Sequence, residues 1–122
     1  MENSLRADLI EWLRSDPGLS DINSIGEESP LRAAPPWLGL AASASTLWGT
    51  KDKPGREIRI ALELESRTDD TAADAGLLTA IEDRVLALPI FGNGYELASI
   101  RFLRGRSEQR EDNRRGTLLE FQ

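Results

Sequence analysis

Residues 57–66 read EIRIALELES, and their large apolar side chains fall on every second position: Ile58, Ile60, Leu62 and Leu64. A period of two is that of a β-strand with one buried face. The intervening positions carry mostly charged groups, so we predict that Glu63 and Glu65 are solvated on the opposite face. A strand of this kind is typical of an antiparallel sheet covered by helices on one side only.

Two amphipathic helices are predicted, one before this strand in the sequence and one after it. The first spans residues 4–16 and ends at the turn signal Asp-Pro-Gly, and the second begins near Asp69. Their apolar side chains recur every three to four residues, which places them on one stripe. The stripes consist of Leu5, Leu9, Trp12 and Leu13 in the first helix and of Ala73, Leu77, Ile81, Val85 and Leu88 in the second.

Further strands are predicted at 36–44, 95–104 and 116–122, with a short edge strand near 21–25. We therefore predict an α+β fold in which an antiparallel β-sheet carries two main helices on one face, in the order α-β-β-α-β-β. A chain of 122 residues fits one domain, residues 1–122. Long loops are expected near 19–36, 44–56 and 105–115 because turn-forming and charged residues gather there.

Composition excludes several classes of function. The chain has no Cys and no His, so disulfides, zinc sites with thiolate or imidazole ligands, and catalytic triads with an imidazole base are ruled out. Lys plus Arg is 15 against 21 for Asp plus Glu, and a net charge of −6 argues against a general nucleic-acid binder. The N-terminus lacks the pattern of a signal peptide, and no apolar run is long enough to span a membrane, so we expect a cytoplasmic protein.

Asp69, Asp70 and Asp74 lie at the predicted start of the second helix. Four backbone N–H groups lack acceptors there and the helix dipole favours negative charge, each effect being worth about 0.3–2 kcal/mol. Capping thus explains Asp69 and Asp70 without a ligand. No EF-hand or phosphate-loop spacing accompanies them. We predict no catalytic residue, no metal site and no cofactor.

The segment 101–115 is locally basic, with six arginines against three acidic residues. It is either a solvated hairpin or an arm that contacts acidic surfaces of neighbouring copies, or lies near DNA. Trp48 stands in an otherwise polar stretch and either packs on its own domain or anchors a partner. The candidate residues for a subunit or partner interface are Arg101, Arg104, Arg106, Arg110, Arg114, Arg115, Trp48, Lys51, Lys53 and Arg56.

The order of these features resembles the tail-completion, or tail-terminator, family of long-tailed phages and gene transfer agents. The resemblance runs over nearly the whole chain. The matching segments are the opening helix LRADLIEWLRSDPGL, the Pro-rich approach AAPPWLGL, and LWGTKDKPGREIRIALELES followed directly by the helix DDTAADAGLLTAIEDRVLALP.

This resemblance implies a structural protein of the virion or phage-like particle, assembled in the bacterial cytoplasm and without catalytic activity. Its copies would form a ring, usually hexameric, that terminates the tail tube and joins it to the head–tail connector or stopper protein. DNA would pass through the ring without sequence-specific binding, and no membrane would be involved.

Our hypothesis is that the Arg-rich segment of one copy meets an acidic surface of its neighbour, of the tube or of the connector, in a heterologous contact that closes a ring. Residues 1–50 carry three basic and seven acidic residues, which suits such a contact. Two alternatives stay open. One is a monomeric adaptor that docks a single protein on its sheet, and the other is a small metal-dependent enzyme using Asp69, Asp70 and Asp74 with Glu63 or Glu65.

Overall fold

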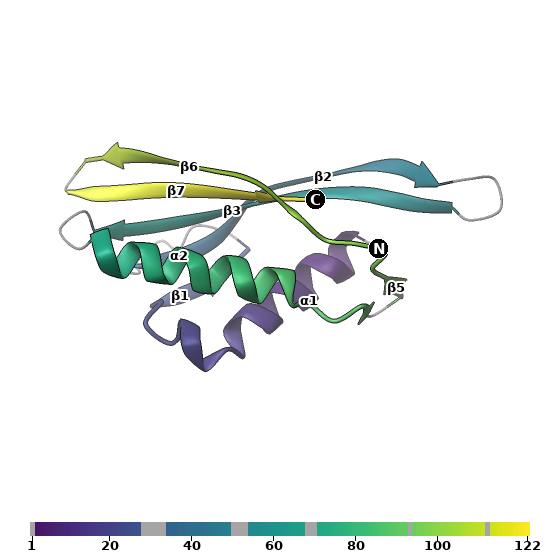
Figure 1. Ribbon diagram of the computed structural model, residues 1–122, viewed down its shortest axis with the longest axis horizontal. Helices are drawn as coiled ribbons and strands as arrows, with labels where there is room; N and C mark the ends of the chain where they lie inside the picture. Colours follow the sequence, from purple (N-terminus) through teal and green to yellow (C-terminus); the bar gives the residue numbers. More distant parts are fainter. Residues whose placement is uncertain (1, 28–33, 50–53, 68–70, 93, 112) are drawn as a thin grey trace.

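The computed structural model describes residues 2–27, 34–49, 54–67, 71–92, 94–111 and 113–122. Two helices, a short 3-10 turn and several strands follow one another along the chain (Figure 1). In order they are α1 (Glu2–Arg14), η1 (Pro17–Leu19), β1 (Ser24–Gly26), β2 (Trp37–Gly49), β3 (Pro54–Arg67), α2 (Thr71–Leu86), β4 (Phe91–Gly92), β5 (Tyr95–Glu96), β6 (Phe102–Arg110) and β7 (Arg114–Phe121).

The main sheet has the strand order β1-β2-β3-β7-β6, and a small separate pair is formed by β4 and β5. All neighbours in the main sheet run antiparallel except β1, which lies parallel to β2. The predicted α+β class is confirmed, as is the order of its main elements. The short edge strand is present, and its parallel direction makes the sheet mixed.

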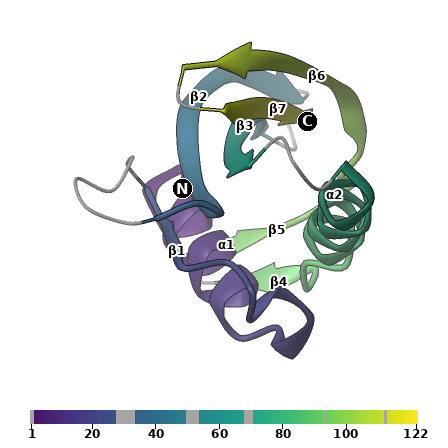
Figure 2. The ribbon, with the colours of Figure 1, turned by 90° about the vertical axis from the view of Figure 1, so that its left-hand side faces the viewer.

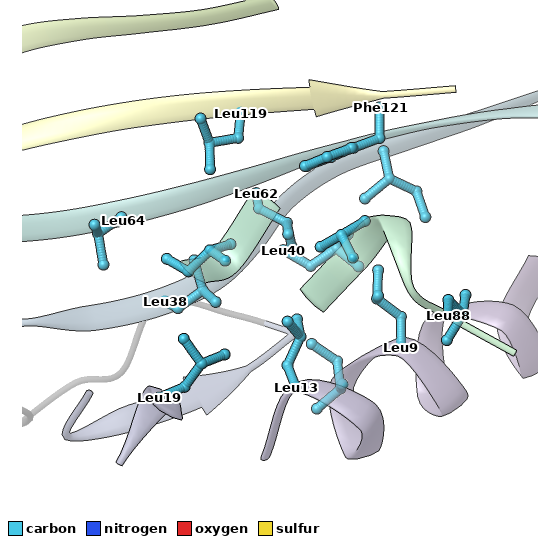
Figure 3. Close-up of a cluster of buried hydrophobic side chains, with 14 of the residues drawn as sticks. Leu9, Leu13, Leu19, Leu38, Leu40, Leu62, Leu64, Leu88, Leu119 and Phe121 are labelled. Atoms are coloured by element: carbon cyan, nitrogen blue, oxygen red, sulfur yellow. The ribbon is translucent and has the colours of Figure 1, made fainter. Parts of the chain in front are cut away.

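Both helices lie on one side of the sheet, as Figures 1 and 2 show. The alternation in β3 decides which side this is, since Leu62 and Leu64 are fully buried beneath the helices. Ile81 of α2 and Leu13 of α1 meet them in the core. Figure 3 shows these layers, with Leu119 and Phe121 of β7 completing the sheet side. No described helix combines the length and the apolar character that crossing a membrane requires.

Two of the predicted loops are wrong. Residues 44–49 and 54–56 belong to β2 and β3, which form one long hairpin extending past the helices on the right of Figure 1. Residues 105–110 belong to β6, which pairs with β7. Polar and charged side chains are compatible with strands here because one face of each hairpin is not covered by helices. The predicted loop 19–36 contains η1 and β1.

The two helices are joined through Trp12 and Arg84. The Trp12 indole Nε1 donates a hydrogen bond of 2.7 Å to the Arg84 carbonyl oxygen. The Arg84 guanidinium in turn lies 3.4 Å from the centre of the indole ring, at cation–π distance. At the start of α2, Asp74 accepts a 2.8 Å hydrogen bond from Ser66 Oγ, which ties the helix to the end of β3.

The burial pattern predicts that the same substitution has a large effect on stability at one leucine and almost none at another. Leu62 is 0% exposed, so Leu62→Ala should lower the free energy of unfolding by about 2–5 kcal/mol, measured by urea denaturation. Leu47 is 85% exposed on the long hairpin, and Leu47→Ala should change it by less than about 0.5 kcal/mol. Equal losses in the two variants would contradict the assigned core.

Candidate functional site

The face of the sheet turned away from the helices, called the outer face below, is built from alternate residues of β3, β7 and β6. On β3 these include Glu63 and Glu65, which stand opposite Leu118 and Gly116 of β7. Gly116 is in turn paired with Glu108 of β6. Strand register therefore places Arg104, Arg106 and Arg110 of β6 and Arg114 of β7 on the same face as the carboxylates of β3. Arg115 pairs with Ser66 and lies on the opposite, helix-covered face.

Glu63 and Glu65 are not solvated, which corrects the prediction from sequence. Their side chains are only 17% and 11% exposed, because Arg110 lies over both. Arg110 Nη2 donates a hydrogen bond to Glu63 Oε2, and Nη1 lies 3.5 Å from Glu65 Oε1. The hydrogen bond that Arg110 donates to Glu63 raises the pKa of Arg110, although desolvation acts in the opposite direction. A single guanidinium thus contacts two neighbouring carboxylates.

Gly116 makes this arrangement sterically possible. β7 lies between β6 and β3, so the Arg110 side chain must cross it to reach the two glutamates. A Cβ atom at position 116 would lie 2.2 Å from Arg110 Cζ, well inside van der Waals contact. Only glycine leaves the space that the guanidinium occupies.

Glu65 is held from two further directions. The Trp37 indole Nε1 donates a 2.7 Å hydrogen bond to Glu65 Oε2, and Arg114 Nη1 lies 3.4 Å from the same oxygen. β2, β3, β6 and β7 therefore all contribute to one polar cluster on the outer face, formed by Trp37, Glu63, Glu65, Arg110 and Arg114. We call it the glutamate cluster.

The other predicted arginines have separate surroundings. Arg104 forms an exposed ion pair with Glu120, and their hydrogen bond raises the pKa of Arg104 and lowers that of Glu120. Arg101 donates a 2.7 Å hydrogen bond to Gln122 Oε1. Three further arginines form no ion pair with another described residue: Arg56, Arg106 and Arg115.

Of the remaining predicted interface residues, Lys51 and Lys53 lie outside the described residues, and so does the side chain of Trp48. Arg56 is exposed on β3, close to the end of the long hairpin. The structure thus brings Arg110 and Arg114 together at the glutamate cluster. Arg56 lies on the part of β3 that has no partner in β7.

The arrangement offers little to a metal ion or a reacting substrate. The described residues contain no group of three or more carboxylates placed to hold a metal, and Glu63 and Glu65 are already bound by arginines. Asp69 and Asp70 lie outside the described residues, so their capping role stays a prediction. An open hollow of about 500 Å³ on the outer face is lined in part by Ala42, Ala44 and the Arg104–Glu120 pair.

Sequence reasoning missed the role of Trp37 in the glutamate cluster and that of Gly116, over which Arg110 passes to reach it. Trp37 follows Pro36, and only its place in the strand was predicted. A glycine inside a predicted strand often marks a close approach by another group, and Gly116 carries this signal directly after two arginines. The signal gives no indication of which side chain approaches.

A family model described as tail completion protein gp17 matches residues 7–122, almost the whole chain. The chain belongs to the tail completion protein gp17 family. Members of this family are structural proteins of phage-like tails, so the chain is a tail protein of a virion or phage-like particle and not an enzyme. The predicted resemblance is thereby confirmed.

Among solved structures, the fold is similar to a chain in the virion of a native gene transfer agent particle. The match has a TM-score of 0.82 and covers 98% of this chain and 92% of that chain, at 17% sequence identity. A search of curated protein sequences finds no match. The architecture of the tail completion chain is therefore shared with a particle protein whose sequence has diverged widely.

The close approach at Gly116 predicts that Gly116→Ala displaces Arg110 and leaves two poorly exposed carboxylates without their main partner. The free energy of unfolding should fall by about 1–3 kcal/mol, measured by denaturant titration. Gly76 on α2 is the matched control, since nothing lies within 4 Å of a Cβ there. Gly76→Ala should be neutral or stabilise by up to about 1 kcal/mol through helix propensity. If Gly116→Ala were as stable as Gly76→Ala, the passage of the Arg110 side chain over Gly116 would be refuted.

Proposed function

We propose that this tail completion protein assembles into a ring, hexameric as is usual for tail terminators, that closes the tail tube and joins it to the head–tail connector. The observation that carries the proposal is the family match over residues 7–122. The fold supports it, because a similar chain occurs in a gene transfer agent virion. A closed ring uses heterologous contacts, in which two different surfaces of each copy meet.

The shape of the sheet supports contacts with two different partners. The β2–β3 hairpin extends past the helices at one end of the sheet, and the β6–β7 hairpin reaches the opposite end (Figure 1). We assign one end to the tube protein and the other to the connector protein. Arg56, Trp48, Lys51 and Lys53 belong to the first hairpin or its connection, and Arg115 to the second.

The charge distribution supports passage of DNA without retention. Arg110 and Arg114 are engaged with Glu63 and Glu65, and Arg104 with Glu120, so much of the basic segment is neutralised within the subunit. The chain as a whole carries a net charge of −6. Affinity for a DNA backbone depends on cations that displace phosphate counterions. Pairing with carboxylates lowers the number of arginines that are available to phosphates, since it engages half of the six in the segment 101–115.

Negative-stain electron microscopy of the purified chain, alone at high concentration and mixed with tail tubes of the same particle, tests the proposal. Rings, either free or on tube ends, are the expected result. Mixing with tubes of an unrelated particle is the control, because terminators should recognise their own tube. Monomers in every sample, confirmed by light scattering, would contradict the ring and favour a monomeric adaptor.

A further inference from the structure

The main sheet ends in two strand edges that pair with nothing else among the described residues. β6 is the last strand on one side. On the other side, β1 covers β2 only from Trp37 to Gly39. From Leu40 to Gly49, no strand among the described residues pairs with β2 on the side away from β3. Unpaired edges of this length are templates for pairing with another chain.

Apart from an irregularity between Leu40 and Ala42, the free edge of β2 carries none of the features that usually protect edge strands. Residues 40–49 read LAASASTLWG, without a charged residue and without a proline. Edge strands that stay exposed are commonly blocked by charge, proline or shortness. This edge is long and uncharged, so it fits a strand that is covered when the protein assembles.

We propose that the free edge of β2 pairs with the β6 edge of the neighbouring copy, so that the sheet continues from subunit to subunit. The inference rests on the proposed ring and names the contact that closes it. Within one copy, β2 and β6 run in opposite directions, because three antiparallel steps separate them. If the ring axis runs roughly along the strands, the rotation that relates neighbouring copies leaves the strand directions unchanged. The β6 of one copy and the β2 of the next copy therefore meet antiparallel.

The side chains of the two edges are complementary. Matching the centre of β6 with the centre of the free part of β2 places Arg106 opposite Ala44, and both lie on the outer face. Small residues of β2 leave room for the long arginine chains. Pairing of β6 with a second β6 would bring Arg106 near like charges, which is unfavourable in a strand pair.

The same register brings two exposed apolar side chains together on the helix side. Leu47 of β2 is 85% exposed and Phe102 of β6 is 36% exposed. When Ala44 pairs antiparallel with the neighbour's Arg106, Leu47 stands opposite Leu103 of that copy and beside its Phe102. The proposed contact therefore buries apolar surface that the single subunit leaves in water.

The required offset is reasonable for a closed sheet. Within one copy, Ala44 at the centre of the free edge lies four to five residues along the strands from the level of Arg106. Pairing Ala44 with the Arg106 of a neighbour therefore shifts the neighbouring copy along the strand direction by about 15 Å. Four strand spacings separate equivalent strands of adjacent copies, about 19 Å. The resulting tilt of about 40° falls in the range of closed sheets, roughly 35–45°.

Engineered cysteines test the contact, since the natural chain has none. The double variant A44C/R106C places one thiol on each edge, at two exposed positions. Within a copy, Ala44 is level with Arg59 of β3 and Arg106 is level with Glu63, so the two positions are four residues apart along the strands, about 13 Å. Three strand spacings separate them as well, so a disulfide within one copy is excluded. Mild oxidation of the assembled protein should yield a ladder of cross-linked species up to the ring size on a non-reducing gel. The control pair A44C/T79C, with Thr79 exposed on α2, should give none.

The outcomes separate the contact from the ring itself. Rings seen by microscopy without a ladder would overturn the edge pairing and leave the proposed function intact. Cross-linking of A44C alone into dimers would show β2–β2 pairing and also overturn it. Absence of rings in the unmodified protein would remove both proposals. As a second measure, L47A should fold normally and raise the concentration needed for ring formation roughly tenfold. An unchanged concentration would also overturn the pairing.

Discussion

The reach of Arg110 across β7 is the interaction on which the outer side of this protein depends. β6 is an edge strand with mostly exposed side chains, so it gains little from the hydrophobic core. Its backbone pairs with β7, and Arg110 ties it further to β3 through Glu63 and Glu65. Removing one partner of such a network leaves poorly solvated charge behind, which costs more than the interaction itself contributes. The glycine at 116 leaves the space through which the Arg110 side chain reaches the two glutamates.

The parts of the fold that could be predicted are those in which apolar residues repeat at a regular spacing along a short segment. The alternation of Ile58, Ile60, Leu62 and Leu64 identified both the strand and its buried face. The helical stripe ending in Ile81, Val85 and Leu88 did the same for α2. In each case neighbouring residues share one environment, so a short window of sequence contains the information. The core followed from these two patterns.

The glutamate cluster could not be predicted in this way, because its members are distant in sequence. Arg110 and Glu63 are 47 residues apart, and whether they meet depends on the order of the strands in the sheet. The same composition that indicated a loop at 105–110 forms a strand, since its charges find partners on the outer face. Polar segments remain ambiguous between loop and strand until those long-range pairings are known.

For a tail completion protein, the contacts made within the subunit and the surfaces left for its neighbours serve different purposes. The subunit pairs part of its own charge internally and leaves two strand edges for its neighbours, an uncharged one on β2 and an arginine-bearing one on β6. Hydrogen–deuterium exchange of the free chain and of the chain assembled on tail tubes tests this account most directly. Protection should increase on assembly at the free edge of β2 and along β6, and not on the exposed side of α2. Unchanged exchange at both edges, with new protection on the helices, would contradict it.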